Sequence, residues 1–475
     1  MIIAGHNMKW ILKDIRFWIV LFFTVRLYGI TNPPIEVGHN WRMTVVNMVA
    51  RNFSEIDNTI YYPRLDIAGD KTGITGMEFP IFNYLIYLVS EIFGYQHWYG
   101  RLINLIITSF GMLYFFKLIQ RFFNSEVAFN STIILTVSLW FQFSRKIMPD
   151  TFSASLVIAG LYYGFNYIYN EHKKRHLVNL LLFSALITLG MLSKLSSACL
   201  LAVIGLVVVQ KDISITKKTT LSLIVLICLI PVVFWYFYWV PKLVETYEFW
   251  HFYMGKEFTK GLSEIYNNVP AFLLRFYDSA LKYIGFVVFC IGFVGGFITK
   301  NKKILSISII TFLAFSVFII KAGLNFSHHN YYVLPFIPVM ALVAGYGITL
   351  IKNKKLGIVL LAIISIEGIA NQQHEFRNSK SNEYLIGLES DLDKISAKED
   401  LILINCGQFP TPMYFAHRKG WIDENRNILQ EGYIDSLKSK GLKYAVILKG
   451  TFGDEIDLKP YEKRIDNMDY SIYEL

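Results

Sequence analysis

Long apolar stretches follow one another along residues 1–375 and are separated by short polar connections. A helix of about 20 apolar residues is long enough to cross the hydrocarbon core of a bilayer. The pattern predicts eleven membrane spans, at residues 10–30, 101–121, 127–143, 151–170, 177–193, 195–210, 219–240, 278–299, 304–321, 331–351 and 356–371. We therefore expect an α-helical protein that crosses the membrane many times.

Clusters of lysine and arginine occupy alternate connections between these spans. They are Lys9, Lys13 and Arg16; Lys117 and Arg121; Lys173, Lys174 and Arg175; Lys211, Lys217 and Lys218; Lys300, Lys302 and Lys303; and Lys352, Lys354 and Lys355. Basic connections face the cytoplasm in most membrane proteins. The pattern predicts a plasma (inner) membrane protein with a cytoplasmic N-terminus, and the odd number of spans then places the C-terminus outside.

Residues 79–93 are apolar but short, begin beside Pro80 and contain Glu91. If this segment crossed the membrane, every later basic cluster would move to the outer side. We therefore predict a helix that lies on the outer face, within a long outer loop of residues 31–99. A second outer loop is expected at residues 241–277.

Apolar residues in the first outer loop also recur at helical spacing. Trp41, Val45, Met48 and Val49 fall on one face of a helix drawn over residues 38–53. An apolar stripe opposite a polar face is typical of an amphipathic helix. The spacing thus predicts an amphipathic surface helix that follows the first span.

Residues 376–475 have a different pattern, with short apolar runs between polar segments. The runs predict strands at Asp400–Cys406 and Lys443–Leu448, helices at residues 384–395 and 431–441, and a last strand at Tyr470–Leu475. We therefore divide the chain into a membrane-embedded domain, residues 1–375, and a small extracytoplasmic α/β domain, residues 376–475.

Composition agrees with a membrane protein, because 54% of the 475 residues are hydrophobic, 17% are charged and the mean hydropathy is +0.40. Residues 1–375 carry 32 Lys and Arg against 19 Asp and Glu, whereas residues 376–475 carry 14 against 17. The basic excess therefore belongs to the membrane part. It indicates contact with lipid headgroups and argues against a nucleic-acid partner.

Two acids stand apart on the side predicted to be outside. Glu36 follows the first span in a segment that also carries His39 and Arg42, and Asp150 closes the connection after the third span. A carboxylate at the membrane surface could accept a proton from an incoming hydroxyl group. The plainer alternatives are a solvated loop acid for Glu36 and a helix N-cap for Asp150.

Cations gather at the same predicted membrane level. They are Arg42, Arg145, Lys146, Lys194, His328 and His329. Arg145 and Lys146 form a basic pair in a short outer turn, against the topology rule, and a lysine such as Lys194 is costly inside an apolar zone unless it reaches the headgroups. Together these cations suit a phosphate held at the headgroup plane.

Acids and cations in this arrangement match one kind of reaction. A sugar joined to a lipid phosphate already has a good leaving group, so its transfer needs one base for the acceptor and cations for the departing phosphate. The sequence has no Gly-rich phosphate loop after a strand and no cluster with zinc-ligand spacing. A cytoplasmic nucleotide site is therefore not supported.

Short motifs in a consistent order carry a family resemblance over most of the chain. They are His39–Arg42, Ala50–Phe53, Tyr62–Arg64, Glu78–Pro80, Gly100–Leu102, Arg145–Asp150, His328–Tyr332 and Tyr414–Trp421. With these motifs the chain resembles the GT-C fold membrane glycosyltransferases related to protein O-mannosyltransferases and lipid A aminoarabinose transferases.

The resemblance implies a GT-C fold and an inverting sugar transfer from a polyprenyl-phosphate donor on the outer face. It also implies catalytic acids at Glu36 and Asp150, although the first acid of the family is usually Asp, so Asp57 and Asp66 stay open as the base. The substrate-binding candidates are His39, Arg42, Glu78, Arg145, Lys146, Lys194, His328, His329 and Tyr331. A divalent metal near Asp150 is neither required nor excluded.

The function expected from the sequence is transfer of a sugar to a hydroxyl of a lipid-linked glycan, a polysaccharide or a lipid. Two alternatives stay open. One is a polysaccharide polymerase or ligase, and the other is a transporter or flippase of a lipid-linked glycan. Transporters tend to carry ionisable groups near mid-bilayer and paired internal repeats, whereas in this sequence the acids avoid the span centres and no repeat is visible.

Overall fold

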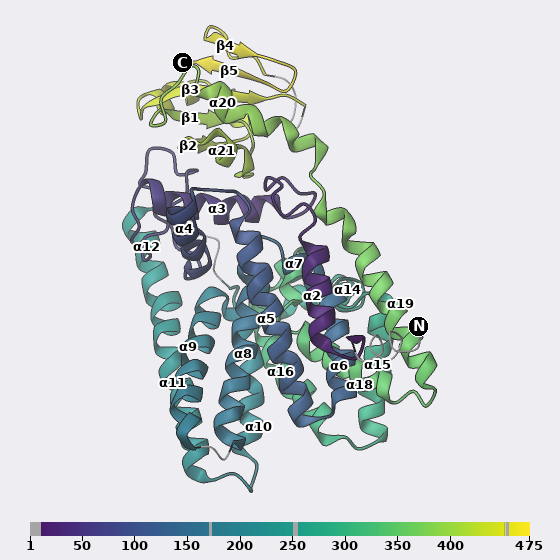
Figure 1. Cartoon of the computed structure of the whole chain (residues 1–475). Coiled ribbons are helices and arrows are strands. Elements are labelled where there is room, and N and C mark those ends of the chain that lie inside the picture. The colour runs from purple at the N-terminus through teal and green to yellow at the C-terminus, as the bar shows by residue number, and fades with distance from the viewer. Residues whose placement is uncertain (1–10, 171–172, 250–254, 451, 453–455) are drawn as a thin grey trace. The chain divides into compact units, whose positions relative to one another are not determined.

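The computed structural model describes residues 11–170, 173–249, 255–450, 452 and 456–475 (Figure 1). The chain forms two compact units. The first, called the helical unit, comprises Met1–Ile30, Arg101–Tyr236 and Tyr253–His374. The second, called the mixed unit, comprises Thr31–Gly100, Phe237–Phe252 and Glu375–Leu475. The segment predicted as the first outer loop and the C-terminal region thus fold together in one unit.

The helical unit is built from helices that pack side by side. They are α2 (Ile15–Arg26), α5 (Tyr99–Phe122), α6 (Ser125–Val137), α7 (Trp140–Phe143), α8 (Pro149–Tyr169), η1 (Lys173–Arg175), α9 (His176–Ser193), η2 (Leu195–Val203), α10 (Ile204–Val208), α11 (Ile215–Phe234), η3 (Trp235–Trp239), α13 (Phe258–Asn267), α14 (Val269–Leu274), η4 (Arg275–Ala280), α15 (Lys282–Ile298), α16 (Lys302–Ala322), α17 (Leu324–His328), η5 (Asn330–Val333), α18 (Ile337–Thr349), α19 (Lys354–Gln372) and η6 (Gln373–Phe376). Helix α8 packs along α9, and α18 packs against both α6 and α15.

Five stretches of the described chain are helical, long and apolar enough to cross a membrane. They are Tyr99–Phe122, His176–Ser193, Ile215–Tyr247, Lys302–Ala322 and Lys354–Phe376, and the pair Val269–Ala280 and Lys282–Ile298, bent by 99°, makes a sixth if it is one span. The predicted multispanning helical class is therefore confirmed. The number of eleven spans is not confirmed, because other predicted spans contain helices of only 12 or 13 residues, such as α2 and α6.

One predicted span departs from regular α-helix. Residues 195–210 begin with nine residues of 3₁₀-helix in η2 and continue into only five residues of α10. A 3₁₀-helix is tighter and its runs are normally short, so a long run of it marks a local departure from ideal helix. This departure directly follows Lys194, at the end of α9.

The mixed unit holds helices from the first loop and a five-stranded sheet. Its elements are α3 (Asn40–Glu55), α4 (Ile81–Phe93), α12 (Val240–Tyr247), η7 (Lys380–Gly387), α20 (Leu388–Leu392), β1 (Leu401–Ile404), α21 (Thr411–Ala416), β2 (Gly420–Ile422), α22 (Asn425–Ile428), α23 (Tyr433–Lys438), β3 (Leu442–Leu448), β4 (Glu462–Asp466) and β5 (Tyr470–Glu474). The strand order is β2-β1-β3-β5-β4. The predicted strands at 400–406, 443–448 and 470–475 are confirmed.

The sheet is parallel across β2, β1 and β3 and antiparallel across β3, β5 and β4. Successive side chains of a strand point to opposite faces. Ile402 and Ile404 therefore join one apolar cluster, whereas Leu403 joins the other, with α22 and α23. The first cluster also contains Val45, Met48 and Val49 of α3, so the first loop covers one face of the C-terminal sheet.

Helix α3 differs from the predicted amphipathic surface helix, because its polar side is buried as well. It packs against α4 and against α21. Asn47, Arg51 and Asn52 are all buried within it. Their partners come from distant parts of the chain, and for that reason the local pattern of apolar residues could not reveal that the polar face is covered.

Candidate functional site

Glu36 lies in an extended segment of the mixed unit whose backbone is held on one side. It forms an antiparallel bridge with Asn378, and the amide of Ser379 donates to the carbonyl of Ile35 at 2.8 Å. Glu36 is buried. The backbone that carries the first candidate acid is therefore tied to the strand-like segment that leads into the C-terminal region.

The chain turns sharply after Glu36, at Gly38 and His39. A Cβ atom at Gly38 would lie 2.5 Å from Oε2 of Glu375, closer than real contacts allow. His39 has a left-handed backbone with φ of 65°, a conformation that few residues other than glycine adopt. The close approach and this turn set the direction in which α3 leaves Glu36.

Arg42 and Glu78, both candidates for substrate binding, form an ion pair with each other. Arg42 lies in the first turn of α3, and Glu78 lies three residues before α4 begins. Both side chains are mostly buried. The pair therefore joins the two helices of the first loop, and any role of Arg42 toward phosphate stays a prediction.

The two alternative acids of the first loop hold local structure. Asp66 accepts hydrogen bonds from Arg51 at 3.0 Å and from Asn52 at 2.7 Å. Asp57 accepts one from Arg64 at 3.0 Å. Burial raises the pKa of Asp66, although the Arg51 charge opposes this shift. Each acid thus serves an ion pair that fixes the loop around it.

Asp150 and Lys194 come together in the helical unit. Asp150 lies in the first turn of α8 and Lys194 follows α9, and their Oδ1 and Nζ atoms are 3.8 Å apart. The N-cap of α8 is Met148, with Pro149 at its first turn, so the N-cap alternative for Asp150 is wrong. A carboxylate in the first turn still interacts favourably with the helix dipole.

The Asp150 carboxylate is 2% exposed, and within the described parts of the chain its Oδ2 atom has no hydrogen-bond partner. Burying a charged oxygen without a full set of partners costs free energy. Such a group often marks a site that a ligand completes. The geometry therefore singles out the Oδ2 atom of Asp150 as an acceptor with room for a further hydrogen-bond donor.

Arg145 and Lys146 lie in the turn between α7 and α8, and both side chains are buried. Arg145 donates from Nη2 to the carbonyl of Gly29 at 2.9 Å. Arg26 of α2 is also buried and donates to the hydroxyl of Ser144 and to the carbonyl of Phe22. The sequence interpretation missed Arg26, although an arginine inside an apolar span was the signal that could have found it.

The histidine motif lies in the same unit. The rings of His329 and Tyr331 are 5.3 Å apart, and the Tyr331 ring is 6.0 Å from that of Phe143, which directly precedes the basic turn. His328 is exposed at the end of α17. The structure therefore brings Tyr331 next to the start of the turn that carries Arg145.

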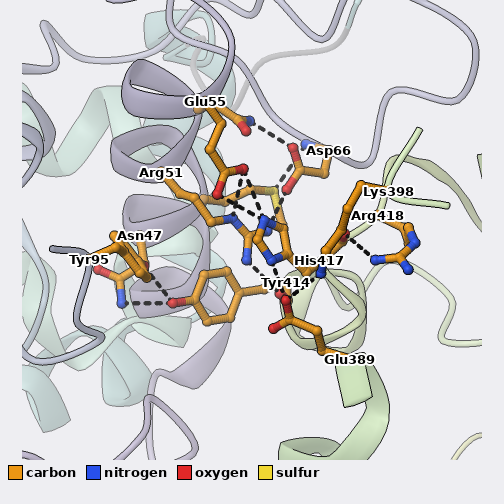
Figure 2. Close-up of polar contacts among 12 residues, drawn as sticks. Asn47, Arg51, Glu55, Asp66, Tyr95, Glu389, Lys398, Tyr414, His417 and Arg418 are labelled. Atoms are coloured by element: carbon orange, nitrogen blue, oxygen red, sulfur yellow. Dashed lines mark hydrogen bonds and ion pairs between the residues drawn. The ribbon is translucent and has the colours of Figure 1, made fainter. Parts of the chain in front are cut away.

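His417 forms a separate charged cluster in the mixed unit, shown in Figure 2. Its Nδ1 atom lies 2.6 Å from Glu389, and its Nε2 atom lies 2.9 Å from Glu55 of α3. Arg418 beside it donates to Asp393 at 2.8 Å. His417 thus connects the C-terminal region with the first-loop helix α3.

This cluster predicts a pH-dependent stability of the mixed unit. Burial would lower the pKa of His417, but the hydrogen bonds to Glu389 and Glu55 outweigh it and raise the pKa above its usual 6.5. A hydrogen bond from His417 holds the pKa of Glu389 down at about 2. Because the histidine pKa is raised, its contribution is complete below pH 6.5 and is lost as the pH rises through the folded value.

Thermal unfolding of the wild type at pH 6 and pH 9 should therefore show lower stability at pH 9, and His417→Gln should lose most of that difference. His176 makes a matched control, since its Nε2 atom lies 3.0 Å from the carbonyl of Asn170 and its ring packs on that of Tyr167, and neither partner is a carboxylate. An unchanged pH profile in His417→Gln would contradict the assignment.

Within the described residues, no group of three or more His, Cys, Asp or Glu side chains is arranged to hold a metal ion. Asp150 and Glu78 are instead paired with cations, and His417 is paired with the two carboxylates of Glu389 and Glu55.

The family model of dolichyl-phosphate-mannose-protein mannosyltransferase matches residues 77–235 of this chain. This range contains Glu78, Arg145, Lys146, Asp150 and Lys194. No curated protein sequence matches the chain.

Solved structures resemble the whole chain. ArnT from Cupriavidus metallidurans bound to undecaprenyl phosphate is 14% identical, with a TM-score of 0.61 over 96% of this chain and 98% of that one. The oligosaccharyltransferase of Archaeoglobus fulgidus is 11% identical, with a TM-score of 0.59 over 90% of this chain and 69% of that one. The same archaeal enzyme, AglB, in complex with an inhibitory peptide and a dolichol-phosphate has a TM-score of 0.56 at 12% identity, over 91% and 69%.

The family model covers part of the first half of the chain, and the solved structures share its fold along nearly the full length. Together with the apolar helices they describe a multi-pass membrane protein. The chain therefore has the GT-C fold of these solved structures, and residues 77–235 are similar to the dolichyl-phosphate-mannose-protein mannosyltransferase family.

Proposed function

We propose that this protein is an inverting glycosyltransferase that uses a polyprenyl-phosphate-sugar donor on the outer face of the plasma (inner) membrane. The acceptor is a hydroxyl group of a lipid-linked glycan, a polysaccharide or a lipid. The alternation of basic connections supports the outer face as the side of the reaction. The division into a membrane-embedded domain of residues 1–375 and an extracytoplasmic domain of residues 376–475 is part of this proposal.

The observation that carries the proposal is the charged group at the start of α8. Asp150 pairs with Lys194, and the turn that leads into Asp150 carries Arg145 and Lys146. Cations at one place suit a phosphate. The relatives support the same ligand, because the ArnT structure is bound to undecaprenyl phosphate and the AglB structure holds a dolichol-phosphate.

The proposed reaction consists of one proton transfer and the replacement of the sugar–phosphate bond by a sugar–acceptor bond. The acceptor hydroxyl oxygen attacks the anomeric carbon of the sugar while the bond from that carbon to the phosphate oxygen breaks. Glu36 takes the hydroxyl proton, and the bonding electrons leave with the phosphate as polyprenyl phosphate. Attack opposite the leaving group inverts the anomeric configuration. Arg145, Lys146, Lys194 and the motif His328–Tyr331 stabilise the departing phosphate.

Asp150 keeps Lys194 in place beside the phosphate and orients the donor in this scheme. His39, Arg42 and Glu78 shape the first-loop side of the reaction, since Arg42 and Glu78 hold α3 and α4 together near Glu36. None of these steps uses a divalent metal.

Donor dependence tests the proposal. Purified protein in nanodiscs receives a radiolabelled single-sugar undecaprenyl phosphate and an extract of the cell's lipid-linked glycans. We expect release of undecaprenyl phosphate together with a labelled glycan of inverted configuration. A transporter or flippase would move the donor without releasing phosphate, and a polymerase or ligase would require an oligosaccharide donor. Either result would overturn the proposal.

Substitution of Lys194 by Met should weaken the donor interaction. Hydrogen bonds to charged groups contribute about 1.5–3 kcal/mol, so we expect donor affinity to fall about 10–150-fold. Lys217→Met is a suitable control, because Lys217 donates to the carbonyl of Ile168 at the other end of α8. Equal donor affinity in Lys194→Met and wild type, measured by titration with undecaprenyl phosphate, would remove Lys194 from the phosphate site.

A further inference from the structure

We propose that Asn104 is a positioning residue that sets the place of Arg145, Lys146 and Asp150 by binding the backbone of the turn that carries them. This inference rests on the proposed function, because it assigns the turn a ligand, the donor phosphate. Asn104 itself lies in the first part of α5 and is fully buried. Neither the sequence motifs nor the ion pairs described above include it.

The side-chain amide of Asn104 donates to both sides of the basic turn. Its Nδ2 atom lies 2.9 Å from the carbonyl oxygen of Phe143, 2.9 Å from that of Lys146 and 3.2 Å from that of Met148. These carbonyls lie where α7 ends, in the turn and at the N-cap of α8. One amide group therefore fixes the backbone before, within and after the pair of cations.

The other atom of the amide is held as well. Oδ1 of Asn104 accepts hydrogen bonds from Thr108 at 3.0 Å and from Thr151 at 3.1 Å. Thr151 also lies 3.0 Å from the carbonyl of Phe143. An amide has two donor hydrogens and two acceptor positions. Here the two hydrogens are shared among three carbonyls, and the one hydroxyl hydrogen of Thr151 is shared between Oδ1 of Asn104 and the carbonyl of Phe143. The orientation of the Asn104 side chain is thus fully determined.

The backbone carbonyls of this turn are buried and need hydrogen-bond donors. A buried carbonyl without a partner costs free energy. Past α7 the backbone hydrogen bonds become long, with Arg145 to Gln142 and Lys146 to Phe143 both at 3.3 Å. The Asn104 side chain adds a shorter hydrogen bond to the Phe143 carbonyl and further donors to the carbonyls of Lys146 and Met148. If they are lost, the turn can shift, and a displacement of about 1 Å in a positioning group can cost about 10²-fold in rate.

Asn104→Asp is the sharpest test, since it keeps the shape of the side chain and replaces the donor by an acceptor that repels the three carbonyls. The experiment measures donor and acceptor KM, kcat and thermal stability of the full chain in nanodiscs, and binding of undecaprenyl phosphate. We expect binding of this probe and donor affinity to weaken about 10–100-fold, the range that such a displacement allows, with little change in acceptor KM.

A matched control exists in the same unit. Gln372 of α19 is buried, and its Nε2 atom donates to the carbonyls of Val137, Ser138 and Gly368 at 3.2, 3.1 and 2.8 Å. It therefore supports the turn between α6 and α7 in the same manner, but this turn carries no cation. Gln372→Glu should lower stability to a similar extent and leave donor KM unchanged.

The split between KM and kcat separates positioning from folding. A variant that is merely less stable has fewer active molecules, so its apparent kcat falls while donor KM is unchanged. Displaced cations raise donor KM instead. Thr151→Val removes one hydrogen bond to Asn104 with little change in shape, and it should shift donor KM in the same direction by a smaller factor.

The outcomes keep the two proposals distinct. If the wild type neither binds undecaprenyl phosphate nor releases it from a donor, the proposed function fails. If the wild type does both, and Asn104→Asp and Thr151→Val keep wild-type donor KM and probe affinity, the positioning role of Asn104 is wrong while the proposed function stands. Should Asn104→Asp not fold, the result for Thr151→Val decides.

Discussion

Replacing Glu36 with Gln should lower turnover of the donor by about 10²–10⁴-fold, the usual contribution of a general base, and leave donor binding nearly unchanged. The amide has the same shape as the carboxylate but cannot take the proton of the acceptor hydroxyl. The backbone bridge to Asn378 does not involve the side chain, so it should persist in the variant. Initial rates with the labelled donor, compared with titration of undecaprenyl phosphate, measure the two effects separately.

The matched controls are the alternative acids of the same loop. Asp57→Asn weakens the pair with Arg64, and Asp66→Asn weakens that with Arg51, so both variants should lower stability more than they lower the rate per folded molecule. A large loss of rate in folded Asp57→Asn or Asp66→Asn, together with near-normal turnover in Glu36→Gln, would move the base to that acid.

The sequence pattern predicted well wherever structure depends on neighbouring residues. Apolar length located the helices of the helical unit, and short runs rich in Ile, Leu and Val located β1 and β3. The edge strands were harder. Strand β2 has only three residues, and β4 is mostly exposed, so neither has the apolar pattern of a buried strand.

The sequence could not predict which residues far apart in the chain form pairs. Asp150 and Lys194 are 44 positions apart, and the pattern around each one indicates only a charge at the end of an apolar helix. Arg42 and Glu78 each looked like a ligand for substrate, yet they form an ion pair across α3 and α4. A single sequence names candidate charges, but the fold decides which of them meet.

The first loop illustrates the same limit at the level of units. Its helix α3 shares an apolar cluster with the C-terminal strands through Val45, Met48 and Val49. These three residues carried the predicted apolar stripe, so the stripe was correct. Besides α4, part of what it packs against lies more than 300 residues further along the chain, among residues 385–472. Nothing in the local pattern indicates that distance.

The polar side of α3 should be as important for stability as the apolar side. Arg51 donates to Asp66 at 3.0 Å and to the carbonyl of Tyr414 at 3.2 Å, and its guanidinium lies 4.9 Å from the centre of the Tyr414 ring (Figure 2). The Arg51 and Asp66 side chains are only 5% and 9% exposed. One residue thus joins α3, the loop that follows it and α21.

Arg51→Ala should therefore destabilise the mixed unit by about 3–5 kcal/mol, because it leaves the Asp66 charge buried without its partner. Since burial raises the pKa of Asp66, the variant should recover part of this loss near pH 4, where the carboxyl takes up a proton. Hydrogen exchange of the β1 and β3 amides, followed at pH 7 and pH 4, measures both effects.

Arg64→Ala is the comparison, since the pair of Arg64 with Asp57 is more exposed, at 15% and 35%, and such pairs contribute about 0–1 kcal/mol. Replacing Arg51 and Asp66 together by Met and Leu removes both charges and should restore much of the stability lost in Arg51→Ala. If the double variant is no more stable than Arg51→Ala, the loss comes from packing around Tyr414, and the buried charge of Asp66 is not its cause.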